Sequence, residues 1–200
     1  MNHTPQWYRT DEYEEAVSSL EAAERFVREV RDDPSWWKWV IISTHCAVQG
    51  FMVLHLRGSH SFAPLTDKSA AACIEAHRSG KPPPNERLDN FPKLYKKVKG
   101  DFPLGLVTTK HFVPGSDTDR CMKKLNELRN ELIHFTPKGW SLEIAGLPNI
   151  CLEAINVVEF LFEHGGNIAF YNQEHADRTR SALRVMKEEL KAAHNQAMQS

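Results

Sequence analysis

The chain of 200 residues has an ordinary globular composition, with 41% hydrophobic and 26% charged residues, and its length suits one domain. Its formal net charge is −1 and its isoelectric point about 6.8, so no overall positive charge draws it to nucleic acid or to an acidic membrane. We therefore expect no DNA partner. The acidic and aromatic N-terminal stretch lacks the apolar core of a signal peptide, which predicts a cytoplasmic protein.

Charge is unevenly distributed along the chain. Nine acidic and three basic residues lie between Asp11 and Asp33, whereas eight basic and three acidic residues lie between Lys93 and Lys124. The four cysteines are far apart, no two histidines are separated by four positions, and the carboxylates do not cluster. We therefore expect neither a metal site nor a cofactor, and we interpret the cysteines as buried thiols.

The first part of the chain predicts two long helices. Apolar residues at helical spacing indicate one helix from Asp11 to about Asp32, ended by an Asp-Pro pair, and a second from Trp36 to about Arg57. The second helix is apolar on nearly all sides, which is typical of the central helix of a bundle. Polar residues such as Lys38 and Gln49 interrupt it, so a core helix is favoured over a membrane span.

The segment from about 58 to 116 is rich in proline and glycine, which break every periodic pattern before it becomes long. Two short helices are still predicted within it, one from Thr66 or Asp67 to about Arg78 and one from Phe91 to Val98. Long structureless loops are uncommon in compact domains. We therefore interpret this segment as an ordered insertion within a single domain that spans residues 1–200.

The stretch CMKKLNELRNELIHF predicts an amphipathic helix after the insertion. Its apolar residues fall within an arc of about 80° at 100° per residue, and they are Cys121, Leu125, Leu128, Leu132 and Phe135. Pro137 and Gly139 should end this helix near Thr136. Two more helices are predicted at about 148–162 and 177–197. The predicted fold is all-α: an antiparallel bundle of four or five long helices with a Pro-rich, partly helical insertion.

The polar side of this helix carries the candidate catalytic residues. Asn130 and His134 are neighbours four positions apart, whereas Arg129 points about 140° away from His134. Arg129, Asn130 and His134 in RNELIH resemble the signature of the HEPN superfamily, in which an Arg is followed by a polar residue and, after four to six intervening positions, by a His. A different interpretation is a surface salt bridge by Arg129 and a helix-capping role for His134.

The resemblance implies metal-independent RNA cleavage, in which the ribose 2′-hydroxyl attacks the adjacent phosphate and leaves a cyclic phosphate and a 5′-hydroxyl. His134 suits proton transfer, Arg129 offers paired donors to phosphate, and Asn130 would orient the imidazole or hold a phosphate oxygen. Because one His cannot easily be both base and acid in one step, we expect a homodimer with a composite site. The family also suggests a toxin or defence role, with an antitoxin or nucleotidyltransferase as partner.

Basic residues near the motif predict contacts to RNA. Lys96 and Lys97 lie in a run with interleaved aromatic residues, and Lys123 lines up with Asn130 and His134 on the helix. A solvated basic face with the aromatic residues turned inward is the simpler interpretation of that run. At the level of the whole protein, the alternative to a nuclease is a non-catalytic HEPN-like module that binds RNA or a protein partner.

Overall fold

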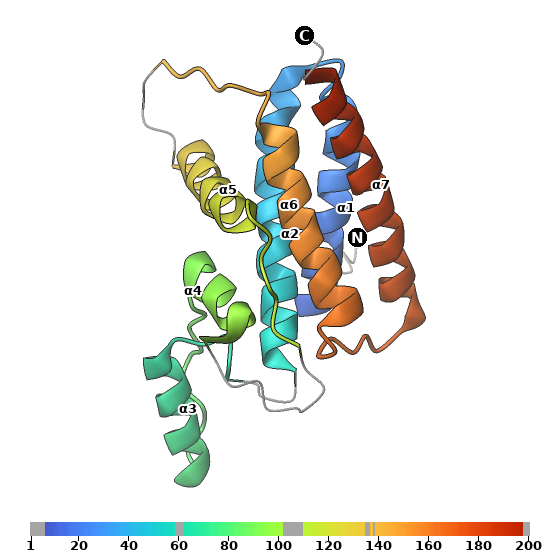
Figure 1. Cartoon of the computed structure of the whole chain (residues 1–200). Helices are drawn as coiled ribbons and strands as arrows, with labels where there is room; N and C mark the ends of the chain where they lie inside the picture. Colours follow the sequence, from blue (N-terminus) through green and yellow to red (C-terminus); the bar gives the residue numbers. More distant parts are fainter. Residues whose placement is uncertain (1–6, 59–61, 102–109, 135–136, 138, 198–200) are drawn as a thin grey trace, which may run out of the picture.

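The computed structural model describes residues 7–58, 62–101, 110–134, 137 and 139–197, and this part of the chain contains helices and no strands (Figure 1). The five long helices are α1 (Glu12–Glu29), α2 (Trp37–Arg57), α5 (Thr118–Ile133), α6 (Leu147–Glu159) and α7 (Gln173–Ala197). Two shorter α-helices lie in the insertion, α3 (Asp67–Arg78) and α4 (Phe91–Lys96). The predicted all-α bundle with a partly helical insertion is confirmed.

The starts of the first two long helices follow from local capping. The side chain of Asp11 accepts hydrogen bonds from the backbone N–H groups of Tyr13 and Glu14, and three acidic residues in the first turn of α1 complement the helix dipole. The 3₁₀ turn η1 (Pro34–Trp36) precedes α2, and the carboxylate of Asp33 caps it at the N–H of Ser35. This turn delays the start of α2 to Trp37.

The bundle consists of two antiparallel hairpins, α1 with α2 and α6 with α7 (Figure 1). At one end of the first hairpin Arg57 pairs with Glu12, and at the other the rings of Phe26 and Trp36 stack with centroids 5.4 Å apart. In the second hairpin Lys187 pairs with Glu159 at 2.6 Å. Each hairpin therefore has the antiparallel arrangement that the sequence predicts.

Between the hairpins, however, neighbouring helices run parallel. Arg178 near the start of α7 binds Glu14 near the start of α1, and Arg31 and Glu189 pair farther along both segments. Helices α2 and α6 are likewise parallel in Figure 1. In Figure 1 the described residues 110–117 run back along the bundle to α5, and α6 begins beside the first part of α2. The antiparallel order of the bundle thus holds within each hairpin, and the two hairpins lie with parallel helices side by side.

Helix α2 is the centre of the bundle and contacts α1, α4, α5 and α6. It lies close to α1 at Gly50, where an added Cβ atom would come within 2.8 Å of the Ala16 Cβ. Near its other end His55 is fully buried against Gly165, where an added Cβ would come within 2.6 Å of the His55 ring. Small residues at these two positions therefore let the helix and turn backbones approach α2.

The insertion is anchored to the bundle through α4, while α3 lies apart from the long helices in Figure 1. An isolated antiparallel bridge joins Leu65 to Leu88 at the two sides of α3. Within this region the side chain of Asp89 is only 3% exposed and pairs with the ammonium group of Lys97 at 2.7 Å. These contacts support the prediction of an ordered insertion.

Two sequence expectations concern burial. Residues 34–57 form the one described helix that is long and apolar enough to cross a membrane, and 67% of its most apolar window is buried inside the protein, as expected for a core helix. Cys73, Cys121 and Cys151 are buried thiols, as predicted, but Cys46 is exposed. Cys46 lies on a part of α2 that its neighbours leave uncovered.

The close contact at Gly50 predicts an unusual response to alanine. Gly→Ala in a helix interior normally stabilises by about 1 kcal/mol, but Gly50→Ala should lower the free energy of unfolding by about 1–3 kcal/mol because its methyl group overlaps Ala16. Urea unfolding measures the change. The compensating pair Ala16→Gly with Gly50→Ala should recover only part of the loss, because the Ala16 Cα would still lie 3.0 Å from the added Cβ. Equal stability of Gly50→Ala and wild type would contradict the contact.

The burial of His55 predicts a pH-dependent stability. Burial lowers the pKa of His55 from 6.5 to about 4, so between these values the unfolded chain binds a proton that the folded protein does not. The contribution of neutral His55 to the free energy of unfolding is therefore at its maximum above pH 6.5 and declines as the pH falls below this value. In His55→Leu, the loss of unfolding free energy between pH 7 and pH 5 should be about 2 kcal/mol smaller than in wild type. Exposed His77→Gln is the matched control; parallel pH profiles for wild type and His55→Leu would refute the assignment.

Candidate functional site

The motif helix α5 is held on the bundle by one apolar side. Cys121, Leu125 and Leu128 are buried as predicted, Leu132 is partly buried against the core, and Phe135 lies outside the described residues. The helix ends at Ile133, because His134 has φ −97° and ψ 48° and so leaves the helical conformation. The predicted end at Thr136 also lies outside the described residues. His134 is therefore the C-cap of α5.

The three motif residues lie together at this end of α5 but are not equally accessible. Asn130 and His134 are exposed, whereas Arg129 is partly buried. The Arg129 Nη1 donates a hydrogen bond to the Asn130 Oδ1 at 3.0 Å, so Asn130 connects the side of the helix that carries Arg129 with the side that carries His134. No hydrogen bond from the His134 ring is seen within the described part of the chain. The imidazole is thus open to solvent and to a ligand.

Buried His45 of α2 lies beneath α5. Its ring stacks on Phe91 with centroids 4.1 Å apart, and its Nε2 lies 3.1 Å from the Asn126 Oδ1. An amide oxygen only accepts hydrogen bonds, so the Nε2 carries the proton and donates it. Burial, with a smaller effect of the Arg129 charge, lowers the pKa of His45 to about 4. His45 is therefore neutral near pH 7 and is a hydrogen-bonded residue of the core.

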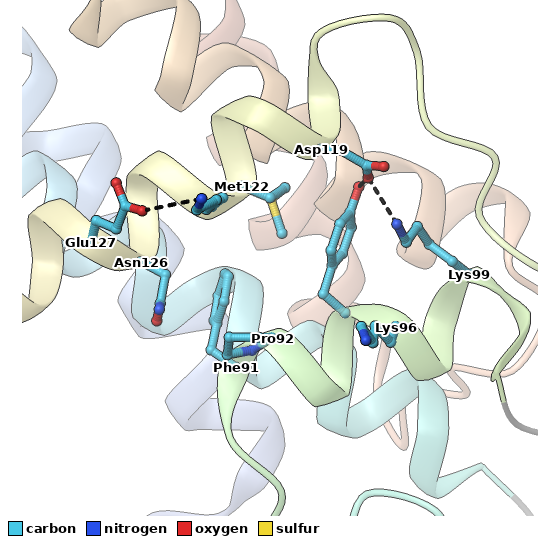
Figure 2. A pocket seen from close by; sticks show the side chains of 10 residues that line it. Phe91, Pro92, Lys96, Lys99, Asp119, Met122, Asn126 and Glu127 are labelled. Atoms are coloured by element: carbon cyan, nitrogen blue, oxygen red, sulfur yellow. Dashed lines mark hydrogen bonds and ion pairs between the residues drawn. The ribbon is translucent and has the colours of Figure 1, made fainter.

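A groove of about 450 Å³ lies between α4 and α5 (Figure 2). Its surface is mostly apolar, and the residues that line it from α4 are Phe91, Pro92, Tyr95 and Lys96. Those from α5 include Met122, Lys123, Asn126 and Glu127. Two of the lysines predicted to contact RNA, Lys96 and Lys123, are therefore brought to the same cavity although they are distant in sequence.

An ion pair borders this groove. The Lys99 ammonium binds the Asp119 carboxylate at 2.9 Å and lies 4.7 Å from the centre of the Tyr95 ring, while the Tyr95 hydroxyl donates to the same carboxylate at 2.8 Å (Figure 2). The Lys99 and Tyr95 hydrogen bonds lower the pKa of Asp119. Burial and the neighbouring carboxylate raise the pKa of Tyr95. This cluster joins the end of the insertion to the first turns of α5.

Lys97, the third lysine predicted to contact RNA, is directed into the protein instead. Its side chain is 12% exposed, its ammonium pairs with Asp89 at 2.7 Å, and it donates to the carbonyl oxygens of Ala63 at 2.9 Å and Leu65 at 2.8 Å. The structure therefore separates Lys97 from Lys96 and Lys123. Its observed contacts stabilise the insertion.

The sequence interpretation missed two features of this region, the groove itself and the contribution of Asn126. On α5, Asn126 is four positions before Asn130, and this spacing alone places both on one side of the helix. What no pattern in the sequence reveals is that His45 and Phe91, from two other elements, meet Asn126 in space. The groove arises from that tertiary contact.

Among the residues that the structure describes, no three His, Cys, Asp or Glu side chains form a group that could hold a metal ion. Comparisons with protein-family models, with curated proteins and with solved structures found no match. Interpretation of the site therefore depends on its own residues and geometry.

The different environments of Lys96 and Lys97 predict that only Lys97 contributes strongly to the free energy of unfolding. Lys97→Met should lower the free energy of unfolding by about 3 kcal/mol, because it leaves the buried carboxylate of Asp89 without its nearest cation. Exposed Lys96→Met, the matched control, should change it by less than about 0.5 kcal/mol. Thermal and urea unfolding measure both. Adding Asp89→Asn to Lys97→Met should restore part of the stability, and a Lys97→Met protein as stable as wild type would contradict a structural role.

Proposed function

We propose that this protein is a metal-independent endoribonuclease of the HEPN type that acts in the cytoplasm. The observation that carries the proposal is the arrangement at the end of α5, where the exposed imidazole of His134 lies beside Asn130, which is in turn bound to the Arg129 guanidinium. A general acid or base must reach the substrate, and the exposure of His134 meets this requirement. A toxin or defence role would fit such an activity.

The chemistry assigns a different task to each residue. Cleavage requires removal of the proton from the attacking 2′-hydroxyl, protonation of the leaving 5′-oxygen and stabilisation of the charged phosphorane-like transition state. His134 supplies a proton-transfer group. Arg129 retains guanidinium N–H groups besides the one that binds Asn130, and these donors suit phosphate oxygens. Asn130 holds the guanidinium near the helix face that carries His134.

A second copy of the chain would complete the site. A single His cannot readily act as base and acid in the same step, whereas two copies of His134 related by a two-fold axis supply both groups. Ile133, immediately before His134, is 43% exposed despite its large apolar side chain. Its position supports a contact between copies at this end of α5. An antitoxin or nucleotidyltransferase partner would act on the assembled dimer.

One observation favours the alternative of a non-catalytic module that binds RNA or protein. Arg129 is partly buried, and its Nε is shielded from solvent without a hydrogen-bond partner among the described residues. A guanidinium in this position also suits a structural role beside His45 and Cys46: burial lowers the pKa of His45 and raises that of Cys46, and the Arg129 charge has a smaller lowering effect on both. In that case α5 would supply a dimer or partner contact and His134 would have no chemical role.

Cleavage of an RNA pool in EDTA distinguishes these functions. Wild type should produce cyclic-phosphate and 5′-hydroxyl ends, and His134→Ala should reduce the rate by about 10²–10⁴-fold, the usual contribution of a proton-transfer group. His77→Ala, an exposed His near the end of α3, is the matched control and should cleave like wild type.

Circular dichroism and light scattering would establish that all three proteins are folded and in the same oligomeric state. Intact RNA after incubation with folded, dimeric wild type would reject the nuclease assignment. Equal cleavage by wild type and His134→Ala would reject His134 as the catalytic group.

A further inference from the structure

The groove between α4 and α5 has the shape and surface of a site for a flat ring. Phe91 and Pro92 lie on one side of it and Met122 on the other (Figure 2); Phe91 and Met122 are buried in its floor, 4% and 1% exposed, whereas Pro92 is exposed, and the groove has a volume of about 450 Å³. Aromatic and apolar side chains of this kind bind nucleobases by stacking, which contributes about 1–3 kcal/mol per base. The surface therefore suits a base better than it suits a charged group.

The side-chain amide of Asn126, which lines the groove, is held in one orientation by a hydrogen bond to a core residue. The Asn126 Oδ1 accepts the Nε2–H of buried His45 at 3.1 Å, and His45 is itself held by stacking on Phe91. With its oxygen directed at His45, the amide of Asn126 must present its NH₂ group elsewhere, and Asn126 lines the groove. A preoriented NH₂ donor beside an apolar slot suits the ring nitrogens and carbonyl oxygens of a nucleobase.

The charges around the groove indicate which larger molecule would carry that base. Lys96 is exposed and forms no ion pair within the described residues, and the Lys123 side chain is 81% exposed and only loosely paired with Glu127 at 3.9 Å. Asp119, by contrast, is already paired with Lys99. Three lysines and two carboxylates, Asp119 and Glu127, line the groove, so its net charge is +1, and this positive charge complements the phosphates of a single strand next to its base.

The groove also lies on the side of α5 that leads to the motif. At 100° per residue, Asn126, Asn130 and His134 fall within an arc of about 80°. Along the axis Asn130 is about 6 Å and His134 about 12 Å beyond Asn126. A strand whose base enters the groove would therefore reach His134 within roughly two nucleotides.

We propose that this groove is a nucleobase subsite for single-stranded RNA. One base packs against exposed Pro92 over the floor formed by Phe91 and Met122 and accepts a hydrogen bond from the Asn126 amide, while Lys96 and Lys123 bind the adjoining phosphates. This inference rests on the proposed nuclease function and extends it, because the subsite would select which phosphate is presented to His134. His45 acts through Asn126 and is a positioning residue.

The test measures binding without cleavage. Hexamers of each of the four bases, 2′-O-methylated so that the attacking hydroxyl is blocked, are compared with hexamers that lack one base at successive positions. Removing a base leaves every phosphate in place, so electrostatic attraction is constant across each series. For wild type, fluorescence anisotropy should show about tenfold weaker binding when the base at one particular position is missing.

The variants locate this effect in the groove. Asn126→Ala should bind intact hexamers about tenfold more weakly and should lose little more when the sensitive base is removed, because both changes break the same contact. Lys96→Glu should weaken intact and abasic hexamers by the same factor. The matched controls Asn195→Ala and Lys191→Glu, exposed residues of α7, should bind like wild type.

A photocrosslink gives a second measurement that does not depend on any variant being folded. A 4-thiouridine at the sensitive position should crosslink to the peptides that contain Phe91–Tyr95 or Met122–Asn126. Equal binding of intact and abasic hexamers, no binding of any hexamer, or crosslinks to other helices would overturn the subsite. A protein segment that binds in the groove of a protein that binds no RNA would also overturn the subsite.

The cleavage assay reports separately on the nuclease assignment. RNA cleavage that depends on His134 but is unaffected by Asn126→Ala would leave the nuclease and reject the subsite. Base-dependent binding by a protein that cuts no RNA would keep the groove as a base site and reject the nuclease.

Discussion

Helix α2 carries apolar side chains on nearly every side, and removing them from water requires neighbours all around it. Four other helices, α1, α4, α5 and α6, supply that cover. Each buried large apolar side chain contributes about 1.5–3 kcal/mol, so the gain depends on close approach, which Gly50 and Gly165 permit at two points. The arrangement of these helices around α2 is what defines the bundle.

The polar residues that α2 carries into this core then acquire particular roles. His45 has a partner: it stacks on Phe91 and donates to Asn126, so one buried ring connects the core with α4 and α5. His55, in contrast, is packed against Gly165 and makes stability sensitive to acid. The same helix therefore contains one histidine that organises a surface groove and another that only has to remain uncharged.

The candidate site depends on these contacts more than on the motif alone. Helical geometry separates Arg129 from His134, and Asn130, which accepts a hydrogen bond from the guanidinium, lies between them on the helix. The groove adds a second region on the same helix, with its donor directed by His45. If RNA is the ligand, base recognition and phosphate chemistry would then occupy successive turns of α5. A second copy of the chain, related by a two-fold axis and bound at the exposed end of α5, would leave room for both base recognition and phosphate chemistry.

Local patterns in the sequence were sufficient for the helices, because apolar periodicity, capping residues and prolines act over a few residues. They identified the central α2, the buried side of α5 at Cys121, Leu125 and Leu128, and the two short helices α3 and α4. They could not establish that α2 and α6 run parallel, since that follows from the path of the intervening chain. Nor could they separate Lys96 from its neighbour Lys97, because only packing against Asp89 turns one inward. The groove, too, exists only where residues distant in the sequence meet, and tertiary structure alone brings His45, Phe91 and Asn126 together.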